Sequence, residues 1–357
     1  MSTNALITGW GMYAPSRVMT NDELSQMVDT SDEWIVSRTG IRERRIAADD
    51  ETTTTLSVNA ARDALAVAGL DPAELDLILV GTCSPDYPLP ATGVLVARDL
   101  GATRAAGMDL QAACSGFLFA LTTGTSFVRS GMYRNVLVIG VEVLSRFLDW
   151  TDRNTCVLFG DGAGAVVLSA SDQPGGLLGF EMFSDGSGWE GIIVPGGGSA
   201  RPASPQSVAA RDHTIKMAGR EVYKYATRQL AESAAAALRN AGLGVRDIDQ
   251  FLFHLANLRI IESVQASLGI PREKTYLNIE KYGNTSAASV PMALAEAVAD
   301  GRVKEGDKLL MVAFGAGYTA GAAVVEWTAD PQRAFLAPGD QTRLGKPRRG
   351  AEELAIA

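Results

Sequence analysis

The sequence predicts an α/β fold built from two copies of one unit. Short apolar, β-rich runs alternate with alanine-rich helical stretches, which is the pattern of sheets covered by helices. Several runs are apolar at nearly every position, as in strands buried on both faces. In addition, residues 61–80 (ARDALAVAGLDPAELDLILV) align with residues 234–253 (AAAALRNAGLGVRDIDQFLF) at an offset of 173. A period this long indicates a duplication, with two halves related by pseudo-twofold symmetry.

Eight apolar runs are predicted to be strands. They are Ala5–Thr8, Leu75–Gly81, Val136–Val141, Gly164–Leu168, Leu177–Met182, Gln250–His254, Leu309–Ala313 and Gly321–Trp327. Residues 130–140 resemble 300–315, and residues 160–168 resemble 317–327, so each half is predicted to be one β-α-β-α-β-β unit. We assign residues 1–173 to the N-terminal half and residues 174–328 to the C-terminal half. Residues 185–212 predict a loop region, and residues 329–357 predict a tail that is an appendage or partly disordered.

Composition narrows the class of protein. The 357 residues are 46% apolar and 20% charged, which allows a sizeable core. A net charge of −9 argues against non-specific binding to nucleic acid. Three cysteines form neither a disulfide framework nor a zinc motif. The N-terminus does not resemble a signal peptide, and the most apolar segment, residues 135–144, is too short to span a bilayer and is interrupted by Glu142. We expect a cytoplasmic protein without a metal or a membrane segment.

Cys114 is the first candidate for a catalytic residue. It precedes an apolar stretch (SGFLFALTTGTSFV) that predicts a buried helix. A thiol at a helix N-terminus lies near unpaired N–H groups, which favour the thiolate form. The alternative is a small buried residue at a strand–helix corner, since free cysteines are often only core residues. Cys83 and Cys156, beside apolar runs, are predicted to be core residues.

His254 and Asn284 extend this candidate site. His254 ends the predicted strand FLFH, where it could act as an acid, a base or a hydrogen-bond donor, although a single histidine is more often structural. Asn284 lies in YGNTSAAS, before a helix that the repeat relates to the one after Cys114. The duplication therefore predicts that all three side chains converge between the halves.

Two glycine-rich turns need separate interpretations. Residues 314–321 (FGAGYTAG) lack the Lys-Ser/Thr ending of a P-loop and open no helix, so a backbone N–H directed at an oxyanion is the preferred interpretation. Residues 159–168 (FGDGAGAVVL) predict a structural turn into a strand and not a dinucleotide site.

Several segments, in order, resemble ketoacyl-ACP synthase III, the initiating condensing enzyme of dissociated fatty-acid synthesis. They are TSDEWIVSRTGIRERRIA (30–47), AACSGF (112–117), DRNTCVLFGDGAGAVVL (152–168), HLANLRII (254–261), YGNTSAAS (282–289) and AFGAGYTAG (313–321). The resemblance covers about residues 3–327. It implies a duplicated thiolase-like fold with α-β-α-β-α layers, a homodimer, and no metal or other cofactor.

The resemblance also implies a reaction and a catalytic triad. Cys114 would take an acyl group from an acyl-CoA primer, and malonyl-ACP would lose CO2 to give an enolate that attacks the acyl-enzyme. A thiolate suits the first step because it is both a nucleophile and a leaving group. His254 and Asn284 would donate hydrogen bonds to the enolate oxygen. The family places the oxyanion hole at the backbone N–H groups of Cys114 and of a turn residue, here Ala316.

Further contacts follow from the resemblance. The CoA nucleotide is expected on Trp34 and Arg153, with Thr30 and Arg38 near its polar groups; without the family, Trp34 would be read as a packing anchor and Arg38 as a solvated charge. A basic patch for the acidic carrier protein is expected at Arg259, and Arg220, Lys224 and Arg228 could extend it. Leu89 is expected to reach an acyl pocket across the dimer interface.

Two departures from the family pattern keep alternatives open. Leu255 replaces the usual glutamine of the HQAN motif, within the expected carrier-docking segment, and Arg220 stands where asparagine is more common. The alternatives are a polyketide-priming ketosynthase or an acyltransferase with a non-malonyl acceptor. Asn284 favours condensation, since simple acyl transfer needs no decarboxylation site. A non-catalytic partner subunit is disfavoured because such proteins usually lack the nucleophile.

Overall fold

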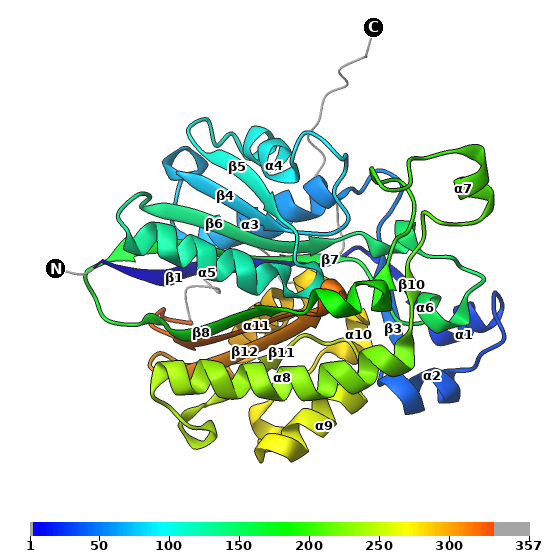
Figure 1. The fold of residues 1–357 in the computed structure, drawn as a ribbon. Coiled ribbons are helices and arrows are strands. Elements are labelled where there is room, and N and C mark those ends of the chain that lie inside the picture. Colours follow the sequence, from blue (N-terminus) through cyan, green and yellow to red (C-terminus); the bar gives the residue numbers. More distant parts are fainter. Residues whose placement is uncertain (1–2, 332–357) are drawn as a thin grey trace, which may run out of the picture.

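Two β-sheets, one from each half of the chain, form the centre of the computed structural model, which describes residues 3–331 (Figure 1). The first sheet contains, in spatial order, β1 (Asn4–Tyr13), β7 (Gly162–Ser171), β6 (Asn135–Glu142), β4 (Leu77–Gly81) and β5 (Ala106–Leu110). The second contains β11 (Gln250–Phe253), β12 (Lys308–Gly315), β13 (Thr319–Glu326) and β8 (Gly176–Ser184). Both sheets mix parallel and antiparallel pairs.

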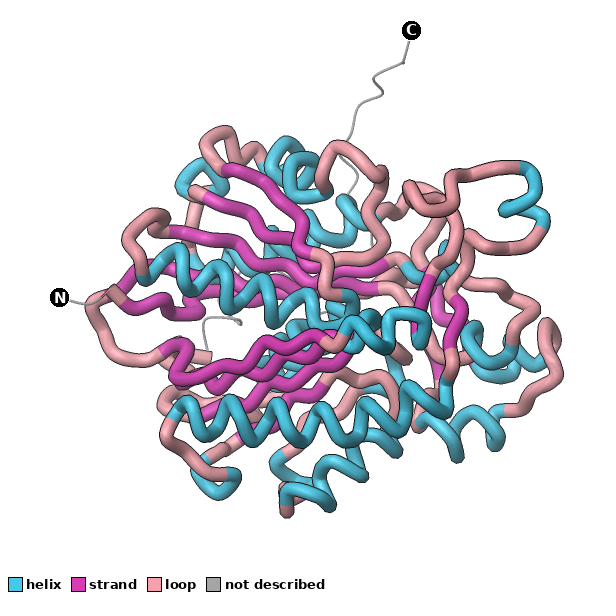
Figure 2. Tube along the Cα trace, viewed as in Figure 1, coloured by secondary structure: helices cyan, strands magenta, loops and turns pink. Residues whose placement is uncertain are grey.

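Helices separate the two sheets and cover their outer faces (Figure 2). The helices α5 (Gly116–Arg129) and α11 (Ser289–Ala299) each contact strands of both sheets, so they form the central layer. The first sheet is covered by α3 (Thr53–Ala68) and α4 (Thr92–Leu100). On the second sheet lies α8 (Gly219–Ala241), against which α9 (Leu258–Leu268) packs. The layers are therefore α-β-α-β-α, as expected.

Shorter elements gather at one end of the two sheets (Figure 1). They include β2 (Arg17–Thr20), α1 (Asn21–Ser25), α2 (Asp32–Thr39), β3 (Glu43–Ile46), α6 (Arg153–Cys156), β9 (Ile192–Ile193), α7 (Pro205–Ala209), β10 (Lys216–Met217) and α10 (Ile279–Tyr282). Of these segments, β9 and β10 line the cavity described below, and α2, α6 and β10 line a second cavity beside it.

The structure confirms the offset of 173 that the sequence repeat predicts. It relates the starts of β4 and β11, of α5 and α11, and of β6 and β12. The left-handed backbone of Ala113 (φ 47°) recurs at Ser286 (φ 49°), at the same offset. The halves diverge after β6, because 19 residues separate β6 from β7 whereas only the short turn Ala316–Tyr318 separates β12 from β13.

All eight predicted strands are found, although their ends shift by a few residues. The strand β5 was not predicted, because AGMDL has no β-branched residue and its half-exposed side chains give no apolar run. The predicted loop at 185–212 contains only short elements, chiefly the turn Gly186–Gly191 and α7. Most of the predicted tail, residues 332–357, lies outside the described residues.

Candidate active site

A cavity of about 890 Å³ lies between the two halves and is lined by residues of both. The structure places Cys114, His254, Asn284 and Ala316 on its wall. These residues come from four separate segments of the chain, so the fold brings together the side chains that the repeat predicted to converge.

Cys114 lies in a single 3-10 turn, Ala113–Ser115, at the start of α5. The turn can approach β4 closely because both Gly81 and Gly116 lack side chains: a Cβ on Gly81 would lie 2.5 Å from the carbonyl carbon of Gly116. The left-handed conformation of Ala113 then turns the chain so that the Cys114 side chain faces the cavity.

The Cys114 thiol does not have the lowered pKa that its place near a helix N-terminus predicts. Burial raises its pKa to about 12, and the hydrogen bond from Ser286 opposes this shift only in part. The Ser286 hydroxyl lies 3.2 Å from the sulfur. Desolvation raises the pKa because the thiolate would be a charge with little access to water. Ionisation of Cys114 therefore needs a proton acceptor.

His254 follows β11 and is buried in the cavity wall. Its Nδ1 atom lies 2.7 Å from the Ser289 hydroxyl, which fixes the ring and leaves Nε2 as its other polar atom. Burial lowers the pKa of His254 to about 3, so the ring is neutral at physiological pH. The Ser289 hydroxyl also lies 2.8 Å from the Ser286 carbonyl oxygen, which can only accept. Nε2 carries the hydrogen and is a neutral donor in the arrangement in which Ser289 donates to Nδ1 and not to that carbonyl.

The carboxamide of Asn284 is oriented by its own chain. Its Oδ1 accepts a hydrogen bond from the Ser286 backbone N–H at 2.8 Å, which leaves the Nδ2 hydrogens as donors. The backbone is also fixed, since the Asn284 N–H donates to Leu158 and its carbonyl accepts from Gly160. The side chain is thus a preorganised donor in a site with little water.

Ala316 begins the turn between β12 and β13. The preceding Gly315 lies so close to the nucleophile that a Cβ there would be 2.7 Å from the Cys114 backbone nitrogen. The left-handed conformations in the turn belong to Gly317 and Tyr318, and not to Ala316. An alanine at position 316 therefore causes no strain in a turn whose backbone adjoins that of Cys114.

The cavity wall around the cysteine is mainly apolar. It includes Cys83, Leu144, Phe159, Ile215 and Phe314. Cys83 is partly buried: it packs against a cluster of core residues, as predicted, and it also lines the cavity. Cys156 is fully buried, as predicted.

Leu89 lies outside the cavity of its own chain. Its side chain is 82% exposed, whereas nearby Asp86 and Pro88 are on the cavity wall. The position leaves Leu89 available to a second subunit.

Two guanidinium groups lie over the aromatic ring of Trp34. Arg38 and Arg153 are 4.8 Å and 5.2 Å from the ring centroid, respectively. A second cavity, of about 460 Å³, adjoins Trp34 and Arg220 and shares Leu158, Met217 and Gly219 with the first. An adenine cannot fit between Trp34 and Arg153 at this separation, so one of the two side chains has to move for the expected stack. Thr30 precedes Trp34 by four residues in the chain. Its hydroxyl is buried and has no hydrogen-bond partner.

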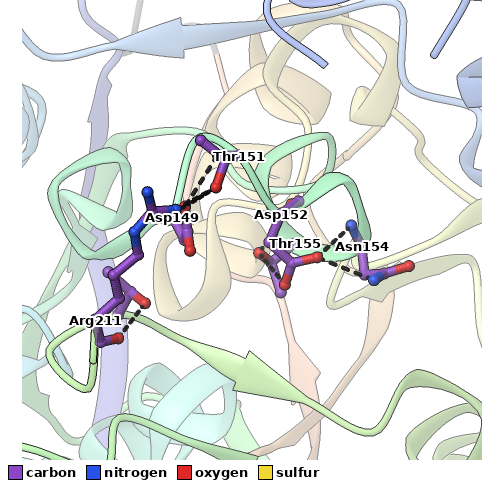
Figure 3. A network of polar contacts seen from close by, with 7 residues as sticks. Asp149, Thr151, Asp152, Asn154, Thr155 and Arg211 are labelled. Carbon is purple, nitrogen blue, oxygen red and sulfur yellow. Dashed lines mark hydrogen bonds and ion pairs between the residues drawn. The ribbon is translucent and has the colours of Figure 1, made fainter. Parts of the chain in front are cut away.

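A polar network supports the segment that carries Arg153 (Figure 3). Asp149 accepts hydrogen bonds from Thr151 and from Arg211, which follows α7. These contacts lower the pKa of Asp149 to about 2. Asp152 caps the short helix α6 through the Asn154 backbone N–H. The network links the loop after α7 to the 19-residue segment between β6 and β7, which carries Arg153.

Basic side chains line one side of α8. Arg220, Lys224 and Arg228 are exposed at intervals of four residues, so they share a helix face. Arg259 is also exposed and its guanidinium lies 5.9 Å from the ring centroid of Tyr223 on α8. The prediction that Leu255 contacts a carrier protein is wrong for its side chain, which is only 1% exposed because it packs in the core.

The site also contains two polar residues to which the sequence analysis gave no role, Glu142 and Ser286. Glu142 is fully buried at the end of β6, and its only signal in the sequence was a charge inside an apolar strand. Among residues 3–331, no cluster of three or more His, Cys, Asp or Glu side chains could hold a metal ion. Within the same range, no helix is both long and apolar enough to cross a membrane.

Comparisons with known proteins agree with this geometry. Residues 108–186 and 238–327 match the N- and C-terminal family models of 3-oxoacyl-[acyl-carrier-protein] synthase III. A β-ketoacyl-[acyl-carrier-protein] synthase III from Desulfitobacterium hafniense (strain DSM 10664 / DCB-2) is 52% identical over 90% of this chain and 97% of its own. One from Roseiflexus sp. (strain RS-1) is 50% identical over 92% of this chain and 100% of its own.

Solved structures give the same result. The 3-oxoacyl-[acyl-carrier-protein] synthase III from Aquifex aeolicus VF5 has a TM-score of 0.84 and 46% identity, covering 90% of this chain and 100% of its own. The priming β-ketosynthase of the R1128 polyketide pathway has a TM-score of 0.86 and 39% identity, covering 92% and 98%. The fold and the site thus define a condensing enzyme of the thiolase-like class. Within that class, the chain belongs to the β-ketoacyl-ACP synthase III family.

Proposed function

We propose that the chain condenses an acyl-CoA primer with malonyl-ACP to give 3-oxoacyl-ACP and CO2, the step that initiates fatty-acid synthesis. The observation that carries the proposal is the shared cavity of Cys114, His254 and Asn284 in a chain about 50% identical to β-ketoacyl-ACP synthases III. The reaction needs no metal or redox cofactor.

In the first half-reaction, the sulfur of Cys114 attacks the thioester carbonyl of the primer and CoA leaves. The tetrahedral intermediate carries an oxyanion that the backbone N–H groups of Cys114 and Ala316 would stabilise. The primer chain would lie against Leu144, Phe159 and Ile215, an apolar wall suited to an uncharged acyl group.

In the second half-reaction, malonyl-ACP loses CO2 and negative charge develops on its thioester oxygen. The Asn284 Nδ2–H and the His254 Nε2–H would donate to this oxygen. Both donors are neutral. The Ser286 backbone N–H holds the Asn284 carboxamide, and the Ser289 hydroxyl contacts Nδ1 of His254. The carbanion then attacks the acyl-enzyme and expels the Cys114 thiolate.

The positions of the charged residues support separate binding sites for CoA and for the carrier protein. Trp34, Arg38 and Arg153 would bind the nucleotide, with Arg220 and the buried Thr30 hydroxyl toward the CoA path. The exposed Arg259 and Lys224 would meet the acidic carrier, assisted by Arg228.

A homodimer is part of the proposal. The strands β5 and β8 are edge strands, and they expose Met108 and Phe180, Met182 and Phe183, respectively. Exposed apolar side chains on sheet edges favour association with another chain. Leu89 would then reach the acyl pocket of the partner subunit.

The three free cysteines fit the cytoplasmic location that the sequence predicts.

Priming of a polyketide pathway is the second candidate, and the similarity to the R1128 priming β-ketosynthase favours it. Both candidates form an acyl-Cys114 intermediate, and they differ in the primer that supplies the acyl group. The experiment is therefore the intact mass of the protein after mixing with a panel of short, branched and longer acyl-CoAs, with Cys114→Ala as the control. We expect one acyl group on the wild type and none on the variant. A protein that no acyl-CoA modifies would contradict the proposal.

A further inference from the structure

Glu142 is a buried carboxylate that the reaction above does not use. It ends β6, is fully buried, and takes part in no ion pair among residues 3–331. Its Oε2 accepts from the Ser84 hydroxyl at 2.5 Å and the Thr82 hydroxyl at 3.2 Å. Its Oε1 lies 3.2 Å from the Cys83 sulfur and 3.0 Å from the Ser286 hydroxyl. Burying an ionised carboxylate without a paired positive charge is costly, even where hydrogen bonds offset part of the cost.

Ser286 connects this carboxylate to the nucleophile. Its single hydroxyl lies 3.0 Å from Glu142 Oε1 and 3.2 Å from the Cys114 sulfur. The residue is held in a left-handed conformation (φ 49°) that places the hydroxyl between the two groups, and Asn284 anchors its backbone N–H. In the described part of the chain, this is the one side-chain hydrogen bond of the Cys114 sulfur.

A hydroxyl has one hydrogen, so it can donate to only one of these neighbours at a time. If Glu142 is ionised, it only accepts; Ser286 then donates to it, and the Cys114 S–H donates to the Ser286 oxygen. If Cys114 is the thiolate, Ser286 donates to the sulfur, and Glu142 must carry a proton to satisfy the Ser286 oxygen. The protonation states of Glu142 and Cys114 are therefore linked through one hydroxyl.

We propose that Glu142 is the proton acceptor for Cys114 and that Ser286 relays the proton between them. Ser286 touches the reacting sulfur, whereas Glu142 acts through it. The inference rests on Cys114 being the nucleophile of the proposed function.

The relay balances over one catalytic cycle. During acylation, the Cys114 proton moves to Ser286 while the Ser286 proton moves to Glu142, and the sulfur lone pair forms the bond to the acyl carbon. The C–S bond to CoA breaks, and the CoA thiolate takes a proton from solvent. Glu142 keeps its proton through the acyl-enzyme stage. When the carbanion displaces Cys114, the thiolate regains that proton through Ser286.

The surroundings of Glu142 suit a group that alternates between two forms. Burial raises the pKa of Glu142, and the hydrogen bonds from Ser84, Cys83 and Ser286 oppose that shift. The titratable groups that act on it are the thiols of Cys83 and Cys114, both of which burial holds in the neutral form.

The test is the rate at which iodoacetamide alkylates Cys114, followed by peptide mass between pH 5.5 and pH 10. This readout requires no acyl-CoA or carrier, so it is independent of the proposed condensation. The variants are Glu142→Gln and Ser286→Ala. The matched control is Ser84→Ala, which removes a hydrogen bond to Glu142 and leaves the link between Ser286 and Cys114.

We expect the wild-type rate to level off above the pH at which Glu142 ionises. In Glu142→Gln and Ser286→Ala, the rate at pH 7 should fall by about 100-fold, the lower range for general-base assistance. It should then rise about tenfold per pH unit as the unassisted thiol ionises. Ser84→Ala should retain a plateau, which begins at a higher pH because the variant loses a hydrogen bond that lowers the pKa of Glu142.

If Glu142 acted on Cys114 only through its charge, Glu142→Gln would change the alkylation rate in the opposite direction. The Glu142 carboxylate raises the pKa of the Cys114 thiol through space, so removing its charge would ease ionisation and make Glu142→Gln faster than the wild type. A faster Glu142→Gln, or a plateau retained in Ser286→Ala, would overturn the relay. If Glu142→Gln fails to fold, Ser286→Ala decides alone, because it keeps the buried carboxylate and its remaining donors.

Discussion

Replacing Asn284 by aspartate separates the two half-reactions. The carboxamide oxygen accepts from the Ser286 backbone N–H at 2.8 Å, and a carboxylate oxygen can accept the same bond. The substitution therefore keeps the shape and the anchor of the side chain and changes only the Nδ2 donor, which becomes an anionic acceptor. We expect the fold and the acylation of Cys114 to be retained.

The expected loss falls on decarboxylation. Removing one preorganised donor to an oxyanion costs about 10²–10³ in rate, or about 3–4 kcal/mol. The side chain is only 6% exposed, so water cannot replace the lost donor, and the new charge repels the enolate. We therefore expect malonyl-ACP decarboxylation to fall by at least about 10²-fold, whereas acylation by acyl-CoA changes by less than about tenfold.

The assay measures CO2 release from malonyl-ACP and, separately, the mass of acyl-Cys114. Asn240→Asp is the matched control, because this exposed asparagine at the end of α8 undergoes the same chemical change away from the cavity. Decarboxylation at the wild-type rate in Asn284→Asp would refute the assignment of Asn284 as the enolate donor.

Three more outcomes follow from the geometry. Gly315→Ala should lower the acylation rate about 10²-fold, because the new Cβ would displace the Cys114 backbone. The control is Gly198→Ala, whose Cβ would meet no atom within 4 Å and which should acylate at the wild-type rate. Equal acylation rates in the two variants would contradict this prediction. His254 has a pKa lowered to about 3, so only the unfolded state binds its proton as the pH falls through 6.5. The free energy of unfolding, measured with urea, should thus lose about 2 kcal/mol more between pH 8 and pH 5 in the wild type than in His254→Gln. Arg259→Glu should raise the KM for malonyl-ACP about tenfold without changing that for acyl-CoA, and the exposed Arg104→Glu should change neither.

The repeat made much of the fold predictable from sequence. The offset of 173 related helices and strands whose bounds the structure repeats, and it related the turn before α5 to the turn before α11. Equivalent turns of a duplicated unit lie across its symmetry axis. The convergence of Cys114 and Asn284 could therefore be predicted from the sequence alone. The edge strand β5 was missed, since edge strands need no continuous apolar run.

The polar surroundings of the nucleophile were not predictable in the same way. Glu142 and Ser286 are 144 residues apart, and only the folded chain shows that they share a hydrogen bond. The pKa of Cys114 was expected to be low from its place near a helix, but burial by both halves raises it. Leu255 was misplaced for a related reason, because exposure depends on which distant segments cover a side chain.

The central claim is that acyl-Cys114 is consumed by a carbanion made from malonyl-ACP. The most direct measurement is a single-turnover chase, in which acyl-Cys114 is prepared, freed of acyl-CoA and mixed with malonyl-ACP. We predict that the acyl mass disappears from the protein at the rate at which CO2 and 3-oxoacyl-ACP appear, with one product for each acyl group lost. An acyl-enzyme that persists in the presence of malonyl-ACP, or that is discharged without CO2, would contradict the account and favour an acyltransferase with another acceptor.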